Sequence, residues 1–546
     1  MNRPRTPGIL YSALAVAMAV LVAVIAVKAS QPPPPTIAEF APQAVEQIKQ
    51  APSEQSGDFG SGTGGVGGGK GGARLAAARR LLPPIDVPRV RHCVGNPPRQ
   101  IEDPQSPPCV AYWKGDNGGA TAKGVTRDTI KIAVPYEDGQ VGNPLTENAK
   151  ALEAFFNRRF EFYGRKIVLF RVQGKDHQAQ NPDPAKQRAD AVEVDARGAF
   201  ASTAYAEQGG IEYEYHDELA RRKIISSFSA WPVQTSEDHF SARAPYEWSP
   251  QMGGTEIGRV MGEWICKQLA GKKAVYAGQD DYRQSKRKFG VIIARSPDGR
   301  KPDLRDMYHT LEGCGAKPAD TVEIRQGTDA QDLTTQHTNA VLKFKQQGIT
   351  SVISFNQYVH LHLSQQAATN ANYNPEWLVS SYELQTDDFG PHGAGSPPQL
   401  AHTFGLRFDN KILPPADRPV QWAVKESNPT LDTGNGDYLY LYAPLLIIAS
   451  GIQMAGPRLT PKTFAEGLAR TRFPNPGVGV APYFQAHVSL GPHDHSFYDD
   501  AAFVWWDGSQ TSYEDGLRGK FCQAPGRYKP GQIPRGDPPV FKGVCH

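Results

Sequence analysis

Side chains that catalyse reactions or bind metals occur in this chain, but their spacing forms no recognisable reaction centre. One Gly- and Pro-containing segment gathers His487, His493, Asp494 and His495. We interpret that segment as a solvated turn rather than a metal site. No Ser-His-Asp or Cys-His arrangement occurs in a recognisable context, and the glycine-rich segment 64–72 lacks the strand, the Lys-Ser/Thr ending and the helix of a phosphate-binding loop. We therefore predict no catalytic residue, no metal and no cofactor.

The six cysteines are the remaining reactive side chains, and we expect them to form three disulfides. Six cysteines allow fifteen pairings. Two cysteines flank a proline-rich segment and two flank the C-terminal tail. Neither segment has the apolar periodicity that would let it fold by hydrophobic packing, so a local disulfide would stabilise it. The last two each lie near the end of a predicted helix, at one edge of a predicted sheet. The expected pairs are Cys93–Cys109, Cys522–Cys545 and Cys266–Cys314.

The N-terminal 30 residues have the pattern of an export signal. Residues 9–27 form an uncharged apolar run that follows Arg3 and Arg5, and its length is close to the roughly 20 residues needed to cross a bilayer. The sequence Val27-Lys28-Ala29 resembles a signal-peptidase site, so a cleaved signal peptide is the alternative to an uncleaved anchor. In either case we predict an exported protein at the cell surface or outside the cell, and we favour membrane tethering.

Composition separates a linker from a globular body. Residues 31–124 contain 14 Pro and 15 Gly, which predicts a disordered linker. The formal net charge is +3, from 59 Lys+Arg and 56 Asp+Glu, and mean hydropathy is −0.48. The first value argues against a nucleic-acid partner and the second excludes a polytopic membrane protein.

The body alternates strand and helix patterns. Residues 129–136 and 167–172 read as buried strands, and 146–159 and 184–194 as helices; a short strand at 197–200, a helix at 213–222 and a strand at 223–228 follow. A second series comprises strands at 273–277, 321–324, 351–355 and 376–380, with helices at 256–269, 303–313, 330–347 and 361–370. Such alternation predicts two α/β lobes with parallel sheets, whose ligands bind beyond the carboxyl ends of the strands. Helices at 419–427, 438–454 and 461–470 and a strand or hairpin at 497–506 complete the chain.

Four segments in this order resemble a known family. They are GVTRDTIKIAV (124–134), DELARRKIISS (217–227), KKAVYAGQDDY (272–282) and FYDDAAFVWW (497–506). Residues 125–510 look like type I periplasmic binding proteins, the substrate-binding components of branched-chain amino-acid ABC importers. The resemblance implies two Rossmann-like lobes joined by a three-strand hinge. Lobe 1 would comprise 125–248 and 411–497, lobe 2 would comprise 249–410 and 498–520, and 521–546 would form a disulfide-clipped tail.

The resemblance also implies ligand-binding residues in the first lobe. In the family, small hydroxyl residues after the third and fourth strands hold a ligand carboxylate. The matching hydroxyls here are Ser202, Thr203 and Ser229, although they could equally cap the following helices. Ala230 stands where the family has a hydroxyl, which is a departure from a standard amino-acid site.

In the second lobe the family uses a tyrosine and an acidic residue to contact the ligand ammonium. Tyr282 and Glu383 fall at those positions, with an ordinary surface acid as the alternative for Glu383. Four further aromatic residues lie at or just past predicted strand ends, where they would widen the pocket for a larger or flatter ligand: Tyr136, Phe200, Trp231 and Tyr358.

These observations predict an extracytoplasmic receptor that closes two lobes around a small polar ligand and presents it to an ABC permease without doing chemistry. The ligand would be an amino acid or an amino-acid-like molecule, and an aromatic one would fit the extra rings. The alternative is a cell-surface interaction or scaffold protein with a degenerate cleft. An enzyme built on the same scaffold ranks below both.

Overall fold

The structure is a computed structural model, and it describes residues 93–94, 99–100, 103, 105–137, 144–175, 183–205, 213–228, 236–297, 299–433, 437–475 and 485–545. The expected N-terminal segment 1–30, most of the expected linker, Ser229 and Trp231 lie outside these residues. Within the described ranges, no helix combines the length and the apolar character needed to span a bilayer.

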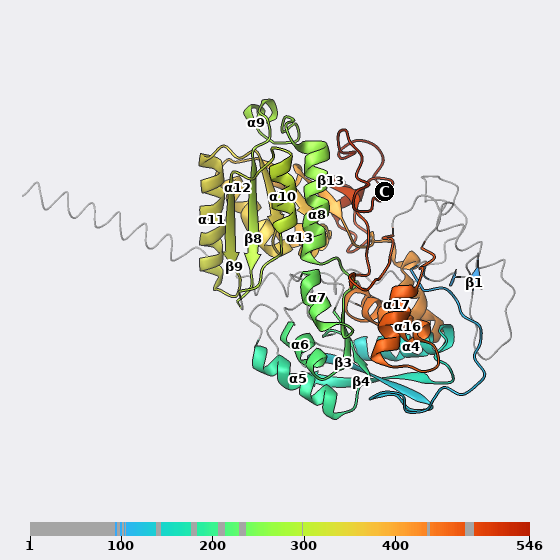
Figure 1. Cartoon of the computed structure of the whole chain (residues 1–546). Coiled ribbons are helices and arrows are strands. Elements are labelled where there is room, and N and C mark those ends of the chain that lie inside the picture. Colours follow the sequence, from blue (N-terminus) through green and yellow to red (C-terminus); the bar gives the residue numbers. More distant parts are fainter. Residues whose placement is uncertain are drawn as a thin grey trace, which may run out of the picture.

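Lobe 1 is built on a five-stranded parallel sheet (Figure 1). Its order is β4 (Lys166–Gly174), β3 (Thr129–Glu137), β5 (Ala201–Ser202), β6 (Ile225–Ser227) and β7 (Glu247–Trp248). Alternation along β3 separates the two layers that cover the sheet. Ile132 joins the core beneath α4 (Pro144–Arg159), whereas Ala133 joins the core beneath α5 (Pro184–Ala196) and α6 (Tyr213–Arg221). The short α7 (Glu237–Arg243) precedes β7.

Three helices from the C-terminal part of the chain pack on lobe 1. They are α15 (Pro419–Ser427), α16 (Ala443–Ala455) and α17 (Pro461–Arg470), and short helical turns η3 (Pro415–Asp417) and η4 (Asp437–Tyr442) precede the first two. Each helix contributes at least one residue to the core that α4 also covers; examples are Val424, Leu445 and Phe464. This layer therefore closes lobe 1 with sequence about 280 residues beyond α4.

Part of the expected linker is folded onto lobe 1. The two-residue strands β1 (Cys93–Val94) and β2 (Arg99–Gln100) pair antiparallel. Gln105 Nε2 donates to the carbonyl of Ala486 at 2.8 Å, and the fully buried Arg165 donates to the carbonyl of Asn117 at 2.7 Å. Residues 105–124, which were expected to belong to the linker, therefore pack on lobe 1, because polar side chains fix this segment without apolar periodicity.

Lobe 2 has a seven-stranded sheet in the order β14–β13–β12–β11–β10–β8–β9. The five strands β8–β12 run parallel, and β13 and β14 are antiparallel to their neighbours. The strands are β8 (Phe289–Arg295), β9 (Asp320–Arg325), β10 (Ser351–Phe355), β11 (Glu376–Ser380), β12 (Thr403–Arg407), β13 (Ala502–Thr511) and β14 (Arg518–Gln523).

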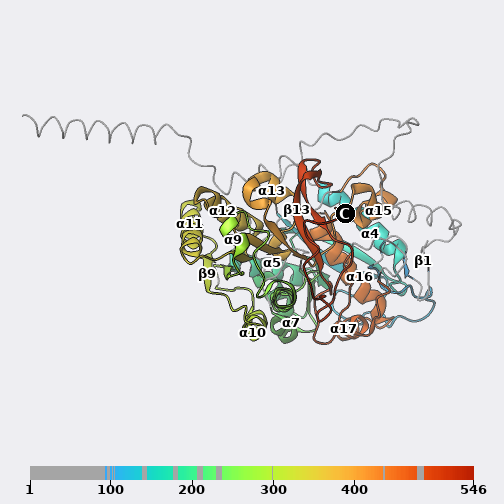
Figure 2. The same cartoon turned by 90° about the horizontal axis from the view of Figure 1, so that it is seen from above.

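Helices cover both faces of the second sheet. One core lies beneath α8 (Gly254–Trp264), its π-helical continuation η1 (Ile265–Leu269) and α10 (Arg305–Gly313), and the other lies beneath α11 (Ala330–Gln346) and α12 (Tyr358–Asn370). Shorter elements lie around the sheet: α9 (Asp280–Gln284), η2 (Tyr382–Leu384), α13 (Phe389–Ala394) and α14 (Pro397–Leu400). Figure 2 shows α11 and α12 on one side of the molecule and the lobe 1 helices α4, α15 and α16 on the other.

The first strand of lobe 2 is not where the sequence pattern placed it. Residues 273–277 form a turn, and Val275 is 52% exposed. The strand is β8, whose first six residues are all buried. The short apolar run at 273–277 was mistaken for a buried strand, whereas the continuous run FGVIIA matches a parallel strand covered on both faces.

The C-terminal end of lobe 2 also differs from the prediction. The strand expected at 497–506 begins at Ala502 and continues to Thr511 as β13, and β14 pairs with it. The first three residues of the expected tail, 521–523, thus form the second half of the edge strand of lobe 2. Edge strands are stabilised mainly by pairing with their neighbour. The modest apolar pattern of RGKFCQ was therefore too weak to predict a strand.

Three chain segments cross between the lobes near residues 249–253, 408–418 and 494–501. Two of them are hydrogen-bonded to each other: Ser249 N donates to the carbonyl of His495 at 2.9 Å, and Phe497 N donates to the carbonyl of Ser249 at 2.8 Å. These two hydrogen bonds hold the first and third crossing segments side by side.

The three predicted disulfides are present: Cys93–Cys109, Cys266–Cys314 and Cys522–Cys545. Cys266 lies in η1 and Cys314 caps the C-terminus of α10, so this bond joins two neighbouring helices of one layer. The third bond ties β14 to the last described residue.

Candidate functional site

The carboxyl ends of the strands in the two lobes face each other across the chain crossings. Arg300 follows β8 in lobe 2, and its Nη2 lies 3.5 Å from Glu214 and 3.3 Å from Asp217 of α6 in lobe 1. The same guanidinium lies over the ring of Tyr213, 4.4 Å from its centroid. In Figure 1 the small helix α7 marks this boundary between the lobes. The space between the facing edges is the candidate functional site.

On the lobe 1 side, the predicted hydroxyl residues lie at the end of β5 but already have partners. The Ser202 hydroxyl lies 2.7 Å from the Tyr215 hydroxyl and donates to backbone carbonyl oxygens, and the Thr203 hydroxyl donates to the carbonyl of Ala204 at 3.0 Å. Both residues are fully buried. They would have to exchange these contacts to hold a ligand carboxylate.

Two predicted aromatic residues of lobe 1 have different surroundings. Tyr136 is the penultimate residue of β3 and stacks on Arg171, whose guanidinium carbon is 3.6 Å from the ring centroid. Phe200 precedes β5 and packs in the lobe 1 core against Phe464 of α17, with 6.4 Å between ring centroids. Phe200 was expected at the carboxyl end of the third strand, but it lies just before that strand, which begins at Ala201.

On the lobe 2 side, Glu383 lies beyond β11 at the expected edge. It is 2% exposed, and both it and Leu384 have left-handed backbone conformations, with φ of 45° and 60°. Its neighbour Tyr382 is fully buried, and burial, the Glu383 carboxylate and the nearby Tyr213 of lobe 1 raise the pKa of Tyr382 well above its ordinary value. Glu383, Tyr382 and Tyr213 therefore form a mixed acidic and aromatic set between the lobes.

Tyr358 also lies at this edge, but it packs rather than faces open space. It begins α12, and its ring lies 4.9 Å from that of Phe389. Both rings pack against a small apolar cluster in which Leu384 of lobe 2 meets Ala443 of lobe 1. Burial raises the pKa of Tyr358 to about 12. This cluster joins the lobes on the side away from Arg300.

Tyr282 lies at the opposite edge of the lobe 2 sheet. It belongs to α9, which precedes β8, and its ring is 6.0 Å from that of Tyr373, just before β11. Gln279, beside α9, accepts a hydrogen bond from Asn374 N at 2.9 Å, which fixes this helix at the amino ends of the strands. The expectation that Tyr282 lies beside Glu383 is therefore wrong, and its cause is the misplaced strand at 273–277.

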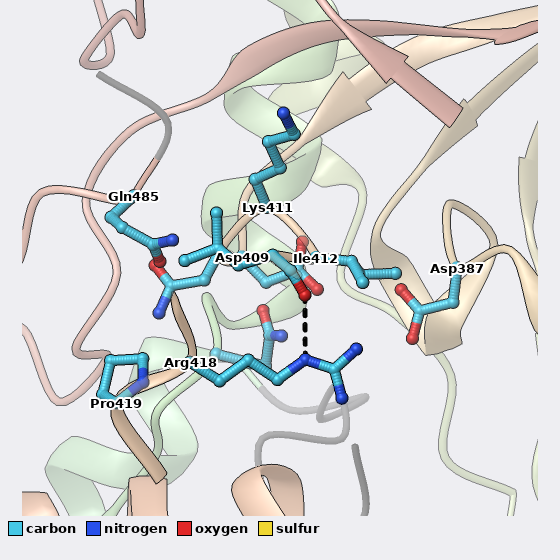
Figure 3. Close-up of a pocket in the computed structure, with 10 residues that line it drawn as sticks. Asp387, Asp409, Lys411, Ile412, Arg418, Pro419 and Gln485 are labelled. Carbon is cyan, nitrogen blue, oxygen red and sulfur yellow. Dashed lines mark hydrogen bonds between the residues drawn. The ribbon is translucent and has the colours of Figure 1, made fainter. Parts of the chain in front are cut away.

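A small cavity of about 50 Å³ opens beside the second chain crossing (Figure 3). Its charged lining residues are Asp387, Asp409, Lys411 and Arg418. Burial raises the pKa values of both carboxyls and lowers that of Lys411 to about 7. Ligand pockets usually measure about 300–1,000 Å³, so this cavity is too small for an amino acid.

The histidines of the segment 487–495 contact different carboxylates. His487 pairs with Asp500, and His495 Nδ1 lies 2.6 Å from Glu237 of α7. His487 and His495 thus connect the third chain crossing to neighbouring acidic residues. They are not part of a solvated turn, as the sequence had suggested.

A second group of charges lies behind the Arg300 contact. Asp217, His239 and Glu247 converge there from α6, α7 and β7, and Arg243 lies beside them. Burial and the Asp217 carboxylate raise the pKa of Glu247 to about 8, and burial together with Arg243 lowers that of His239 to about 4. Sequence reasoning missed this group and Arg300. The only signal was the mixture of Tyr, His and Asp in the helix pattern YEYHDELARR.

No protein-family model matches the chain, and no curated protein matches it. Solved structures similar to it include an ABC-transporter substrate-binding protein from Aeropyrum pernix, with 12% identity, a TM-score of 0.49, and coverage of 74% of this chain and 96% of that one. A solute-binding protein from Rhodopseudomonas palustris in complex with 3,4-dihydroxybenzoic acid has 10% identity, a TM-score of 0.48, and coverage of 74% and 98%.

A third similar structure is a branched-chain amino-acid ABC-transporter protein from Thermus thermophilus with bound valine. It has 13% identity and a TM-score of 0.46, and the match covers 74% of this chain and 97% of that one. All three of these solved structures are substrate- or solute-binding proteins of ABC transporters, the class that the sequence resembles.

Proposed function

We propose that this protein is an extracytoplasmic solute-binding receptor, not an enzyme, that closes its lobes around a small polar ligand and presents it to an ABC permease. The observation that supports this function best is the convergence of Glu383, Tyr382 and Tyr213 between facing strand ends of two lobes. Three chain crossings join those lobes, and such a connection can act as a hinge. Three disulfides fit an oxidising compartment outside the cytoplasm.

The chemistry of the proposed site favours a ligand with a cationic group near lobe 2. The Glu383 carboxylate would pair with an ammonium, and the rings of Tyr382 and Tyr213 would contact it or an adjacent apolar part. Ser202 and Thr203 would contact the anionic end, with Ser229 if its loop reaches the same edge. An amino acid or a related zwitterion, including an aromatic one, fits this polarity.

Ligand-dependent stabilisation tests the proposal. Thermal unfolding of the exported body, residues 93–546, would be followed with a panel of amino acids, aromatic acids and simple amines, and hits would be titrated by calorimetry. A ligand at 100 times its Kd stabilises the folded state by about 2.7 kcal/mol. We expect at least one zwitterion to raise Tm, and the Glu383→Gln variant to lose that response. If charge-bearing compounds stabilise wild type and variant equally, Glu383 does not form the site.

One observation favours the alternative, a cell-surface interaction or scaffold protein. The cavity near the hinge measures only about 50 Å³, and Leu384 and Ala443 close the lobes with apolar contact. A scaffold would keep that closed form permanently, whereas a receptor must open to admit its ligand. A panel in which nothing stabilises the protein, together with solution scattering that shows one closed form, would support the scaffold.

A further inference from the structure

Three potential metal ligands converge in the interior of lobe 1, beside the interlobe contact but outside the proposed solute site. Asp217 comes from α6, His239 from α7 and Glu247 from the start of β7. Their ligand atoms all lie within 4.8 Å of one another. His239 Nε2 is 2.9 Å from Glu247 Oε2 and 3.4 Å from Asp217 Oδ1.

The facing atoms of this cluster are buried, and two of the three groups are carboxylates. Glu247 is fully buried, with His239 Nε2 at 2.9 Å from one carboxylate oxygen and Arg243 Nε at 3.4 Å from the other. Asp217 Oδ1 contacts the same Arg243 Nε. Two buried carboxylates that face one another repel unless positive charge or a proton lies between them. A metal ion held between the carboxylates and the imidazole would supply that charge.

The spacing of these atoms matches a zinc coordination shell. Zn²⁺ binds imidazole nitrogen and carboxylate oxygen at about 2.0–2.2 Å in tetrahedral geometry, which sets neighbouring ligand atoms about 3.3 Å apart. The distances of 2.9 and 3.4 Å lie on either side of that value. We propose that Asp217, His239 and Glu247 bind one Zn²⁺ ion or a similar divalent transition metal.

The surroundings of the proposed ligands have the features of an outer coordination shell. Arg243 Nη2 donates to Asp217 Oδ2 at 3.0 Å, so it can hold this carboxylate while Oδ1 turns to the metal. The Arg243 Nε, which also contacts Oδ1, would have to move aside. The His239 side chain is 14% exposed and marks the route of entry.

The imidazole distinguishes the class of metal. Nitrogen ligands suit Zn²⁺ and its transition-metal neighbours, whereas Mg²⁺ and Ca²⁺ take oxygen ligands. Asp217 also contacts Arg300 of lobe 2 at 3.3 Å. A metal at this site would therefore draw on the same carboxylate that joins the lobes, and its occupancy would be coupled to their closure.

Metal titration of the disulfide-bonded protein tests the site without any solute. Chelator-treated protein would be titrated with ZnCl₂ by calorimetry and equilibrium dialysis. The variants His239→Gln and Glu247→Gln remove one ligand each, and the exposed His493→Gln is the matched control. We expect one Zn²⁺ per chain in wild type and control, and affinity at least tenfold weaker in both ligand variants. Mg²⁺ in large excess should not displace the Zn²⁺.

Cobalt provides a readout that does not depend on the variants. One equivalent of CoCl₂ should give wild-type protein the strong visible absorption of four-coordinate Co²⁺, and Zn²⁺ should abolish it. Failure of wild type to bind Zn²⁺, or equal binding by wild type and both ligand variants, would overturn the proposal. Because the probe is the metal alone, neither result bears on the proposed solute receptor.

Discussion

Glu383 is the residue on which the proposed ligand chemistry depends, and its backbone supports a functional role. Two successive residues with side chains, Glu383 and Leu384, adopt left-handed conformations that cost of order 1 kcal/mol each. Glycine would adopt them without that cost. The turn nevertheless places a carboxylate beside Tyr382 and sends Leu384 to the apolar contact with lobe 1. Strain of this kind is concentrated at binding sites, because position there matters more than stability.

The first prediction concerns the charge of Glu383. Glu383→Gln keeps the size of the side chain and removes its charge, so affinity for a zwitterionic ligand found in the panel should fall about tenfold to a hundredfold, which corresponds to roughly 1.5–3 kcal/mol. Calorimetric titration of wild type and variant measures it. Unchanged affinity would mean that the bound ligand has no cation at this position.

A second prediction concerns the buried ion pair of Arg287 and Glu376, far from the site. The guanidinium donates to both carboxylate oxygens at 2.7 and 2.8 Å, and Ser351 Oγ donates at 2.7 Å. Arg287→Met leaves the carboxylate buried without its cation and should lower the free energy of unfolding by about 3–5 kcal/mol. The double variant Arg287→Met/Glu376→Leu should lose much less. Urea unfolding compares them, and a single-variant loss below about 1 kcal/mol would contradict the expectation.

A third prediction is a pH dependence at His392. Burial lowers its pKa, but the Asp515 carboxylate at 2.5 Å and backbone carbonyl acceptors outweigh that effect, so the net shift is upward from 6.5. A raised pKa means that protonated His392 stabilises the fold fully below about pH 6.5 and loses this effect as pH rises through the folded-state pKa. His392→Asn should therefore cost more stability at pH 5.5 than at pH 9. Equal costs at the two pH values in urea unfolding would show that the charge contributes nothing.

At the scale of elements, close packing of α16 on α17 links the helical layer of lobe 1 to the site. A methyl group at Gly451 would overlap the ring of Phe464. Phe464 also packs on Phe200, before β5, and on Trp248, which ends β7, with centroid distances of 6.4 and 6.0 Å. The role expected for Phe200 as a ligand contact is thus replaced by support of the strand that carries Ser202.

This packing gives the fourth prediction. Gly451→Ala should improve helix propensity by up to about 1 kcal/mol but overpack the interface by about 1–3 kcal/mol, for a net loss of stability. Phe464→Leu removes the obstructing ring and should restore much of the loss that Gly451→Ala causes. A double-mutant cycle from urea unfolding measures the coupling, and additive effects would mean that the helices separate freely.

Sequence patterns predicted helices and strands well where the apolar periodicity extended over many residues. They predicted poorly where contacts between residues distant in sequence determine the position of an element. The strands around Ile132 and the C-terminal helices were predicted because their buried faces are continuous. The strand at 289–295 was missed in favour of a shorter run at 273–277, and this one error displaced Tyr282 to the wrong edge. The contact between Leu384 and Ala443 joins residues 59 positions apart, and no local signal reports it. Likewise, Asp217, His239 and Glu247 have no metal-motif spacing and meet only because β7 pairs beside β6.

At the scale of the whole molecule, the described residues of the two lobes meet beyond the chain crossings through an apolar contact between Leu384 and Ala443 and through a set of charges. The charged set consists of Arg300 with Glu214 and Asp217, and of Arg305 with Asp238 at 3.5 Å. The Arg300 side chain is 25% exposed, so each of its pairs contributes at most about 1 kcal/mol. These charged pairs therefore contribute only a modest part of the contact between the lobes.

The last prediction concerns these charged pairs. Arg300→Glu removes two attractions across the lobes and adds two repulsions of similar size, a change of up to about 4 kcal/mol that should shift the ratio of closed to open molecules by up to several hundredfold. Small-angle scattering of ligand-free protein should then show a larger radius of gyration. A ligand should associate faster and dissociate faster, with weaker overall affinity, because the closed complex loses the same contacts.

Lys301→Glu is the matched control, since it makes the same charge change one residue away but its partner Glu323 belongs to lobe 2. It should leave the radius of gyration unchanged. Adding Glu214→Arg to Arg300→Glu re-creates one of the pairs with the charges exchanged and should recover part of the closure. If Arg300→Glu and Lys301→Glu scatter alike, charge does not hold the lobes together. Closure would then rest on the apolar contact between Leu384 and Ala443, which high salt would strengthen rather than weaken.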